Sequence, residues 1–169
     1  MKYKHIVIAT VIFLMITGNS LAQNSNQSVN DKKMETTEKN KAVVRNLIEE
    51  ILSSKKPELL KNVIADEYVA PNGNKGPGSF FDPVKPLFSA FPDIEWKILD
   101  IIGEGDKVMV RWKWTGTHKA KFNQHEATGK TVTNDGMALF VLKNAKITAT
   151  SILTDRLGFL QQIGAVPVN

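Results

Sequence analysis

The sequence contains no cysteine among its 169 residues. This absence excludes disulfide bonds, thiolate catalysis, iron–sulfur clusters, zinc held by cysteine and lipidation of an N-terminal cysteine. The three histidines, His5, His118 and His125, do not have the spacing of a zinc-binding motif. The sequence therefore indicates no metal site.

Motifs of several common enzyme classes are also missing. The sequence has no G-x-S-x-G element, no phosphate-binding P-loop and no dinucleotide-binding fingerprint. We expect no cofactor, so any catalysis would rest on carboxylate and imidazole groups. The formal charge is +5, but the lysines alternate with acidic residues and form no stripe with aromatic residues, so we expect no nucleic-acid partner.

The sequence has no hydrophobic run long enough to span a bilayer. Its N-terminal run covers residues 6–17, whereas a spanning helix needs about 20 apolar residues. Lysines precede this run and small residues ending at Ala22 follow it, which is the order of a secretory signal peptide. We predict a signal peptide over residues 1–22, cleavage after Ala22, and a secreted or periplasmic protein with no stable membrane span. Loss of Lys2 and Lys4 lowers the formal charge from +5 to +3.

Residues 23–37 contain few apolar side chains, too few to offset the entropy lost when a chain becomes ordered. We predict a disordered linker there. The remaining residues, 38–166, have the length and the aromatic content of one domain with its own core.

The first half of this domain has the apolar spacing of helices. One helix is predicted over residues 37–52, a short one begins at Pro57, and a third covers residues 79–91, shortened or bent by Pro86. After residue 92 the apolar period changes to two, which indicates strands. The predicted strands cover residues 94–103, 108–118, 130–142 and 146–155, with a short turn or helix over 158–166.

Short turns join the first predicted strand to the second and the third to the fourth, while residues 119–129 form a loop between the middle two; the short turns indicate antiparallel pairing. The predicted fold class is therefore α+β, a conical barrel of three N-terminal helices packed on a curved, mainly antiparallel sheet of four or more strands. A curved sheet closed by helices leaves an apolar mouth, which is a usual site for a small molecule.

Two titratable residues near the ends of predicted strands are candidates for acid–base chemistry. Asp155 follows the last strand, where partial burial would favour a general base. The alternatives are an N-cap of the following turn or an ion pair with Arg156. His118 ends the strongest predicted strand and is either a proton shuttle or an ordinary hydrogen-bonding residue.

Other candidates lie within the strands. Arg111 either assists catalysis by pairing with a substrate anion or is structural. Asp135 shares the face of Val141 and is either a carboxylate in the pocket or part of a bulge beside Gly136.

The predicted pocket also draws on apolar residues. Trp112 and Trp114 form either a flat wall for a cyclic ligand or part of the core. Phe88, Phe140 and Val141 complete the predicted lining, together with Asp135.

Seven short segments appear in an order that resembles the SnoaL-like polyketide cyclase, or ester cyclase, family. No single segment is specific, but together they extend over residues 38–166. They are NKAVVR (40–45), ADEYV (65–69), AFPD (90–93), EGDKVMVRW (104–112), TGTH (115–118), TGK (128–130) and DRLGFLQQIG (155–164).

The resemblance implies the conical α+β barrel of ketosteroid isomerase and nuclear transport factor domains, with a deep apolar pocket. It also implies aldol ring closure without a cofactor, in which an aspartate on the last strand removes a proton next to a carbonyl. Asp155 matches the position of that aspartate. The sequence departs from the family at Pro71, Val141 and Thr150, where relatives often have polar residues, so the fold transfers better than the chemistry.

Three functions remain open from the sequence. The first is a cyclase or isomerase type of lyase that uses Asp155 as general base, with His118 or Arg111 assisting. The second is a noncatalytic module that binds an apolar or cyclic small molecule. The third is self-association as a homodimer through the open face of the sheet.

Overall fold

The computed structural model describes residues 26–70 and 72–167. The chain divides into two compact units, Met1–Thr36 and Thr37–Asn169. The predicted signal peptide over 1–22 and the family departure at Pro71 lie outside the described residues. Within the described ranges, no helix is both long and apolar enough to cross a bilayer.

The described part of the first unit differs from the sequence prediction. Residues 26–36 are helical and exposed, whereas we predicted a disordered linker over 23–37. The segment includes Lys32, Lys33, Met34 and Glu35, whose straight side chains lose little rotamer freedom in a helix. The prediction considered only the shortage of apolar residues and overlooked this local helix propensity.

The second unit begins with the predicted helix, which covers residues 37–45 and widens into the π-helical stretch η1 (Asn46–Leu52). Buried side chains recur along it at helical spacing, so this prediction is confirmed. They are Val44, Leu47, Ile48, Ile51 and Leu52.

The next helical segments are shorter than the sequence suggested. The helix that begins at Pro57 is the 3-10 helix η2 (Pro57–Asn62). The single third helix predicted over residues 79–91 is wrong, because two helices, α2 (Pro77–Phe81) and α3 (Lys85–Ala90), occupy this region. Pro86 lies in the first turn of α3, where a missing backbone N–H costs no helical hydrogen bond.

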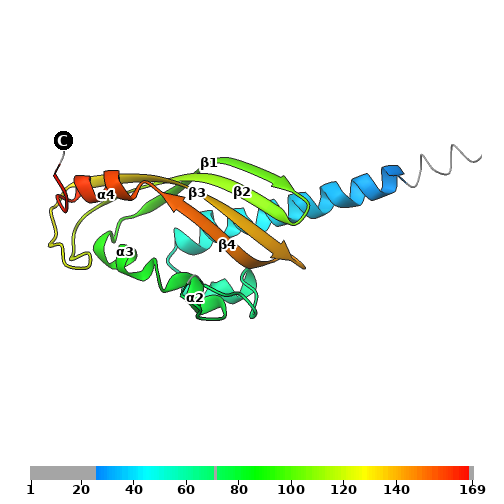
Figure 1. Ribbon diagram of the computed structural model, residues 1–169, viewed down its shortest axis with the longest axis horizontal. Helices are drawn as coiled ribbons and strands as arrows, with labels where there is room; N and C mark the ends of the chain where they lie inside the picture. Colours follow the sequence, from blue (N-terminus) through cyan, green and yellow to red (C-terminus); the bar gives the residue numbers. More distant parts are fainter. Residues whose placement is uncertain (1–25, 71, 168–169) are drawn as a thin grey trace, which may run out of the picture. The chain divides into compact units, whose positions relative to one another are not determined.

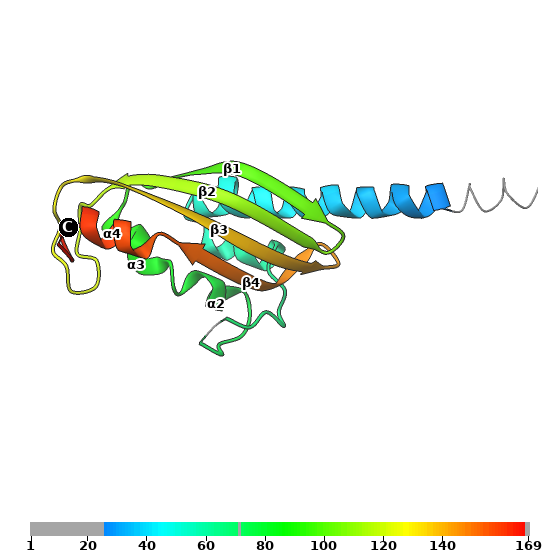
Figure 2. The same ribbon diagram turned by 45° about the horizontal axis from the view of Figure 1, so that its top comes forward.

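The sheet has the predicted meander topology. Its strands β1 (Glu95–Glu104), β2 (Lys107–Thr117), β3 (Thr131–Lys143) and β4 (Lys146–Thr154) pair antiparallel in sequence order. Figures 1 and 2 show the sheet as one curved layer with α2 and α3 on one side. This arrangement confirms the α+β class with helices packed on an antiparallel sheet.

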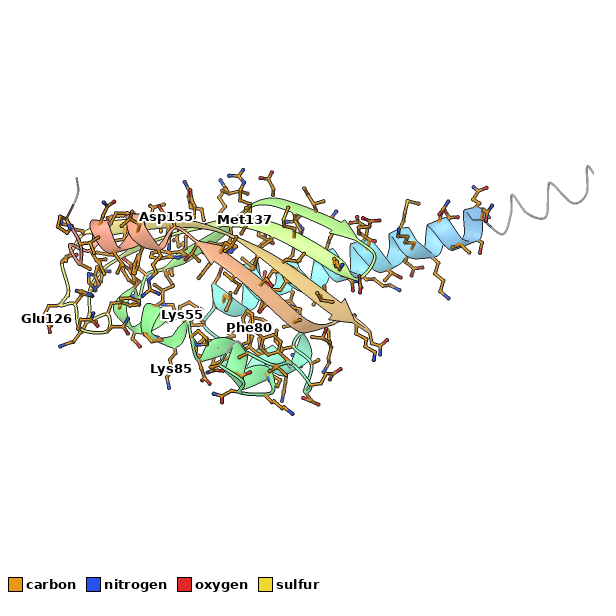
Figure 3. The ribbon with its side chains drawn as sticks, viewed as in Figure 1. Lys55, Phe80, Lys85, Glu126, Met137 and Asp155 are labelled. Atoms are coloured by element: carbon orange, nitrogen blue, oxygen red, sulfur yellow. The ribbon has the colours of Figure 1, made fainter. Side chains whose placement is uncertain are left out.

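Strand alternation divides the sheet into two faces. The inner face of β2 is buried and carries Trp112 and Trp114. The outer face carries Met109, Met137 and Leu139, which are 43%, 44% and 38% exposed. In Figure 3, Phe80 lies among the helices that cover the inner face. The core therefore lies between the helices and the inner face.

Two contacts complete the layer structure. Ile64 forms a parallel bridge with Ile147, so the chain after η2 covers part of the outer edge of β4. At the opposite end, α4 (Arg156–Gln162) lies beside the loop between β2 and β3 in both ribbon views. Phe159 of α4 contacts Phe122 of that loop at a ring distance of 5.1 Å.

Candidate functional site

A cavity of about 550 Å³ lies between the helices and the inner face of the sheet. Its lining comes from η1, α2, α3, all four strands, α4 and residues 122–125 of the loop between β2 and β3. Small-molecule sites commonly have volumes of about 300–1,000 Å³. The cavity is therefore large enough for a molecule of several fused rings.

All three tryptophans of the chain line this cavity. The ring of Trp96 makes an edge contact with Trp112 at 5.0 Å and lies 6.4 Å from Trp114. Trp112 is paired in the ladder with Gly136, and a Cβ atom at Gly136 would collide with the indole ring. The glycine therefore makes room for one of the flat aromatic walls of the cavity.

Polar side chains form a minority of the lining, and they are Asn123, Gln124, His125, Asn134, Thr154 and Arg156. Asn134 is 8% exposed, and its Oδ1 has no hydrogen-bond partner among the described residues. The same holds for the indole Nε1 of Trp96. The ionisable lining residues are His125 and Arg156, and the described part of the lining contains no carboxylate.

A second aromatic cluster lies beside the cavity and contains His118. The imidazole is fully buried, stacks on Phe91 at 5.1 Å, and its Nδ1 lies 3.2 Å from Oγ1 of Thr128. Burial lowers the pKa of His118 below its usual range, and repulsion from His125 lowers it further. His118 is therefore held neutral and does not line the cavity.

Asp155 is exposed and forms the N-cap of α4. Its Oδ1 accepts a hydrogen bond from the backbone N–H of Gly158 at 2.9 Å. The N-cap alternative is thus the one present, and no ion pair joins Asp155 to Arg156 in the described structure. The side chain does not line the cavity, although Thr154 and Arg156 on either side of it do. Figure 3 shows Asp155 at the junction of β4 and α4.

The structure places Arg111 and Asp135 on the outer face of the sheet, away from the cavity. Nη2 of Arg111 lies 2.6 Å from Oδ2 of Asp100, and Nζ of Lys113 lies 3.4 Å from Oδ1 of Asp135. The placement of Asp135 in the pocket is therefore wrong. The bulge alternative is also wrong, because the ladder between β2 and β3 runs through Gly136 without a shift.

The predicted apolar lining is only partly present. Trp112, Trp114 and Phe140 line the cavity, whereas Val141 and Phe88 do not. Val141 shares the outer face with Asp135, because side chains alternate along β3. Phe88 is buried in the core and stacks on Phe81 at 5.4 Å, and Leu87 is the residue of α3 that lines the cavity.

Sequence reasoning missed Trp96, Asn134 and Phe159 as lining residues. For Asn134 a signal was present, because it has the same strand parity as Phe140. Trp96 likewise alternates with polar neighbours in the first strand. Phe159 had no such signal, since α4 reaches the cavity only through tertiary packing.

The chain matches the model of a known protein family. The model of the family described as SnoaL-like polyketide cyclase matches residues 42–163. This match covers most of the second unit, from the first helix to the end of α4. A comparison with curated proteins finds no match.

Solved structures give a consistent result. A protein from Acidithiobacillus ferrooxidans, named as a candidate polyketide cyclase, is 28% identical with a TM-score of 0.68, covering 76% of this chain and 96% of its own. A candidate SnoaL-like polyketide cyclase from Jannaschia sp. CCS1 is 21% identical with a TM-score of 0.69, and the alignment covers 78% of this chain and 96% of that protein. TsrD from Streptomyces laurentii is 20% identical with a TM-score of 0.68, and the alignment covers 74% of this chain and 94% of TsrD. The last two similarities concern the fold alone.

Proposed function

The chain belongs to the SnoaL-like polyketide cyclase family, and on this basis we propose that its cavity binds a small apolar molecule with fused rings. The observation that carries this proposal is the lining, which combines three tryptophans with other apolar side chains and no described carboxylate. Flat aromatic walls favour flat aromatic ligands, because aromatic rings attract each other when they stack or meet edge to face. The ionisable lining residues are basic, so the cavity favours neutral or anionic ligands over cations.

A neutral fluorescent probe tests this proposal. Phenylnaphthylamine should bind, quench the tryptophan emission and raise the melting temperature by mass action. The variant Ala138→Leu fills space in the cavity and should weaken binding, whereas Ala149→Leu makes the same change at an exposed position and should not. Equal binding by both variants, or none by the natural protein, would contradict the proposal.

We propose aldol-type cyclisation as a second candidate function. Family membership favours it. The backbone of Asp155 lies between the lining residues Thr154 and Arg156, so in this role its side chain turns from the cap of α4 towards the cavity. In this reaction the carboxylate takes a proton from the carbon next to a carbonyl. The resulting enolate forms a carbon–carbon bond to a second carbonyl, and the new alkoxide then takes up a proton.

Deuterium exchange tests the first step of this reaction without knowledge of the substrate. Beta-tetralone, a bicyclic ketone, would be incubated in heavy water and its exchange followed by NMR. Asp155→Asn should keep the helix cap, because Asn and Asp are similar N-caps, but should lose the exchange activity. Exchange that is equally fast in the variant and the natural protein would rule out Asp155 as the base.

Export and self-association remain proposals. If the predicted signal peptide is cleaved, protein recovered from outside the cytoplasm begins at Gln23, which mass spectrometry of the intact chain measures.

The outer face of the sheet carries Met109, Met137 and Leu139, and we propose that it forms a homodimer interface. Light scattering should give twice the monomer mass, and Met137→Lys should reduce it to that of one chain.

A further inference from the structure

One end of the cavity is covered by α4 and by the loop between β2 and β3, which lie together at one end of the sheet in Figures 1 and 2. Phe159 of α4 contacts Phe122 of this loop at a ring distance of 5.1 Å and Trp114 of the sheet at 5.8 Å. The lining residues that α4 and the chain after it supply are Arg156, Phe159, Leu160, Ala165 and Val166. The helix therefore forms a cover over this end of the cavity.

The strand β4 is too short to pair with the first residues of β3. The pairing begins at Gly136 and Thr154, so the described part of the chain provides no strand neighbour for residues 131–135 on that side. The edge of a strand presents backbone N–H and C=O groups that need partners. The helix α4 supplies these partners in place of a strand.

A single side-chain amide makes this connection. Oε1 of Gln162 accepts the backbone N–H of Thr133 at 2.9 Å, and Nε2 donates to the carbonyl oxygen of Thr133 at 2.8 Å. Nε2 also donates to the carbonyl oxygen of Gly158 at 3.1 Å, which holds the amide in place on the helix. Within the described ranges, the two bonds to Thr133 are the hydrogen bonds that join α4 to the sheet.

The opposite end of the helix is attached differently. The backbone N–H of Asp155, the N-cap residue, donates to the carbonyl oxygen of Asp135 at 3.1 Å. This backbone bond continues the sheet up to the point where α4 begins. The helix thus has a backbone attachment at its first end and a side-chain attachment at its last end, and the second can break while the first remains.

We propose that α4 is a gate of the cavity, hinged at Asp155 and latched to β3 by the amide of Gln162. When both bonds to Thr133 break, the helix turns away from β3 and withdraws Phe159 and Leu160 from the wall. A ligand then enters or leaves at this end, and the latch sets the rate of exchange. This inference rests on the proposed function, since the molecule that passes the gate is the ligand of the same cavity.

Hydrogen exchange in the natural protein tests the opening without any ligand. The N–H of Thr133 is held by α4, whereas the N–H of the next residue, Asn134, points towards β2, because successive N–H groups of a strand point to opposite sides. If α4 opens while the sheet stays paired, Thr133 should be protected at least about tenfold less than Asn134, after correction for intrinsic exchange rates. Equal protection of the two amides would overturn the gate.

Stopped-flow binding of phenylnaphthylamine tests the latch. Gln162→Leu removes both bonds to Thr133 and should raise the association and dissociation rate constants together, each about tenfold, because the open state becomes more populated. The dissociation constant should stay unchanged, since both directions pass through the same opening. Gln161→Leu is the matched control, because Gln161 donates only to the carbonyl oxygen of Pro167, and its rate constants should equal those of the natural protein.

Gln162→Met is a second replacement without an amide, in case the branched leucine disturbs the helix, and the melting temperature reports whether each variant is folded. A rise in the dissociation rate constant alone would overturn the latch, because it would place Gln162 in the structure of the wall and not in its opening. Unchanged rate constants in both Gln162 variants would also overturn it. Failure of phenylnaphthylamine to bind the natural protein would contradict the binding proposal, while the exchange of Thr133 would still decide whether α4 opens.

Discussion

At the scale of single residues, Asp155 has a structural role that is separate from any chemistry. Its carboxylate accepts the N–H of Gly158 and so caps the first turn of α4. This helix carries Phe159 and Leu160 to the cavity wall. The cap therefore helps to hold one wall of the cavity, whether or not the carboxylate also acts as a base.

Replacement of this cap should destabilise the protein in a predictable order. Asp155→Ala removes the acceptor and should lower the free energy of unfolding by about 1 kcal/mol, whereas Asp155→Asn should change it little. Urea denaturation measures both values. Equal stability of the alanine and asparagine variants would show that the hydrogen bond to Gly158 contributes nothing.

His118 should make stability depend on pH. Burial holds the pKa of His118 below its value in the unfolded chain. At neutral pH both states are unprotonated, but below about pH 6.5 the unfolded chain takes up a proton that the folded state resists. The free energy of unfolding should therefore decrease as the pH is lowered from about 7.5 to about 5. His118→Gln should make the free energy of unfolding depend less on pH over this range.

Two other groups provide controls for this measurement. His125→Gln should keep most of the slope, because desolvation contributes more to the pKa shift of His118 than repulsion does. The N–H of Thr117 and the ammonium group of Lys119 hold the pKa of Asp93 below its usual range. The stabilising contribution of the Asp93 carboxylate is lost only below about pH 4, so this group does not add to the pH dependence between about pH 7.5 and about pH 5. Identical slopes for His118→Gln and the natural protein would contradict the assignment.

At the scale of elements, the hairpin between β3 and β4 contains a strained residue. Asn144 and Ala145 both have positive φ angles, 52° and 58°, as a type I′ turn requires. Alanine adopts this conformation at a cost of about 1–2 kcal/mol, because its Cβ approaches the following carbonyl oxygen. Glycine has no Cβ and is the usual second residue of such a turn.

Ala145→Gly should therefore stabilise the protein, although glycine usually destabilises a fold. We expect a gain of about 0.5–1 kcal/mol, since relief of the strain exceeds the added freedom of the unfolded chain. Thermal denaturation measures this as a higher melting temperature. The matched control Ala149→Gly lies within β4 and should lower the melting temperature, and a decrease for both variants would contradict the turn geometry.

At the scale of the whole molecule, the second unit holds every buried apolar side chain of the described chain. The first of these is Val44, and the helix that carries it is anchored to the β1–β2 turn. Oγ1 of Thr37 accepts the N–H of Gly105, and Asn40 donates to the carbonyl oxygen of the same glycine. The core is thus complete from Thr37 onwards.

A chain that begins at Thr37 should therefore fold with an unchanged melting temperature. A chain that begins at Arg45 loses Val44 and both hydrogen bonds to Gly105, and should lose about 3 kcal/mol of stability. Thermal denaturation of the two truncated forms beside the full chain measures the difference. A marked loss in the Thr37 form would show that the core does not suffice on its own.

Much of the fold could be predicted from the sequence, because local patterns determine it. The alternation in β2 predicts both the strand and the shared face of Trp112 and Trp114, since successive side chains in a strand point to opposite faces. The site was less predictable. The apolar residues that alternate with Asp135 along β3 predict an inner face, but they lie on the outer face, so strand parity assigns Asp135 to the wrong side of the sheet.

The sequence by itself thus determined the first helix of the second unit, the antiparallel strands and the family, since each depends on spacing along the chain. Only the tertiary structure decided which face of β3 is the inner one and that the side chain of Asp155 caps α4 without lining the cavity. The register between strands aligned Trp96, Trp114 and Asn134 in one row. These placements depend on contacts between residues that are far apart in the chain. The two-residue period of a strand is the same whichever of its faces is buried, so the sequence pattern alone does not identify the inner face.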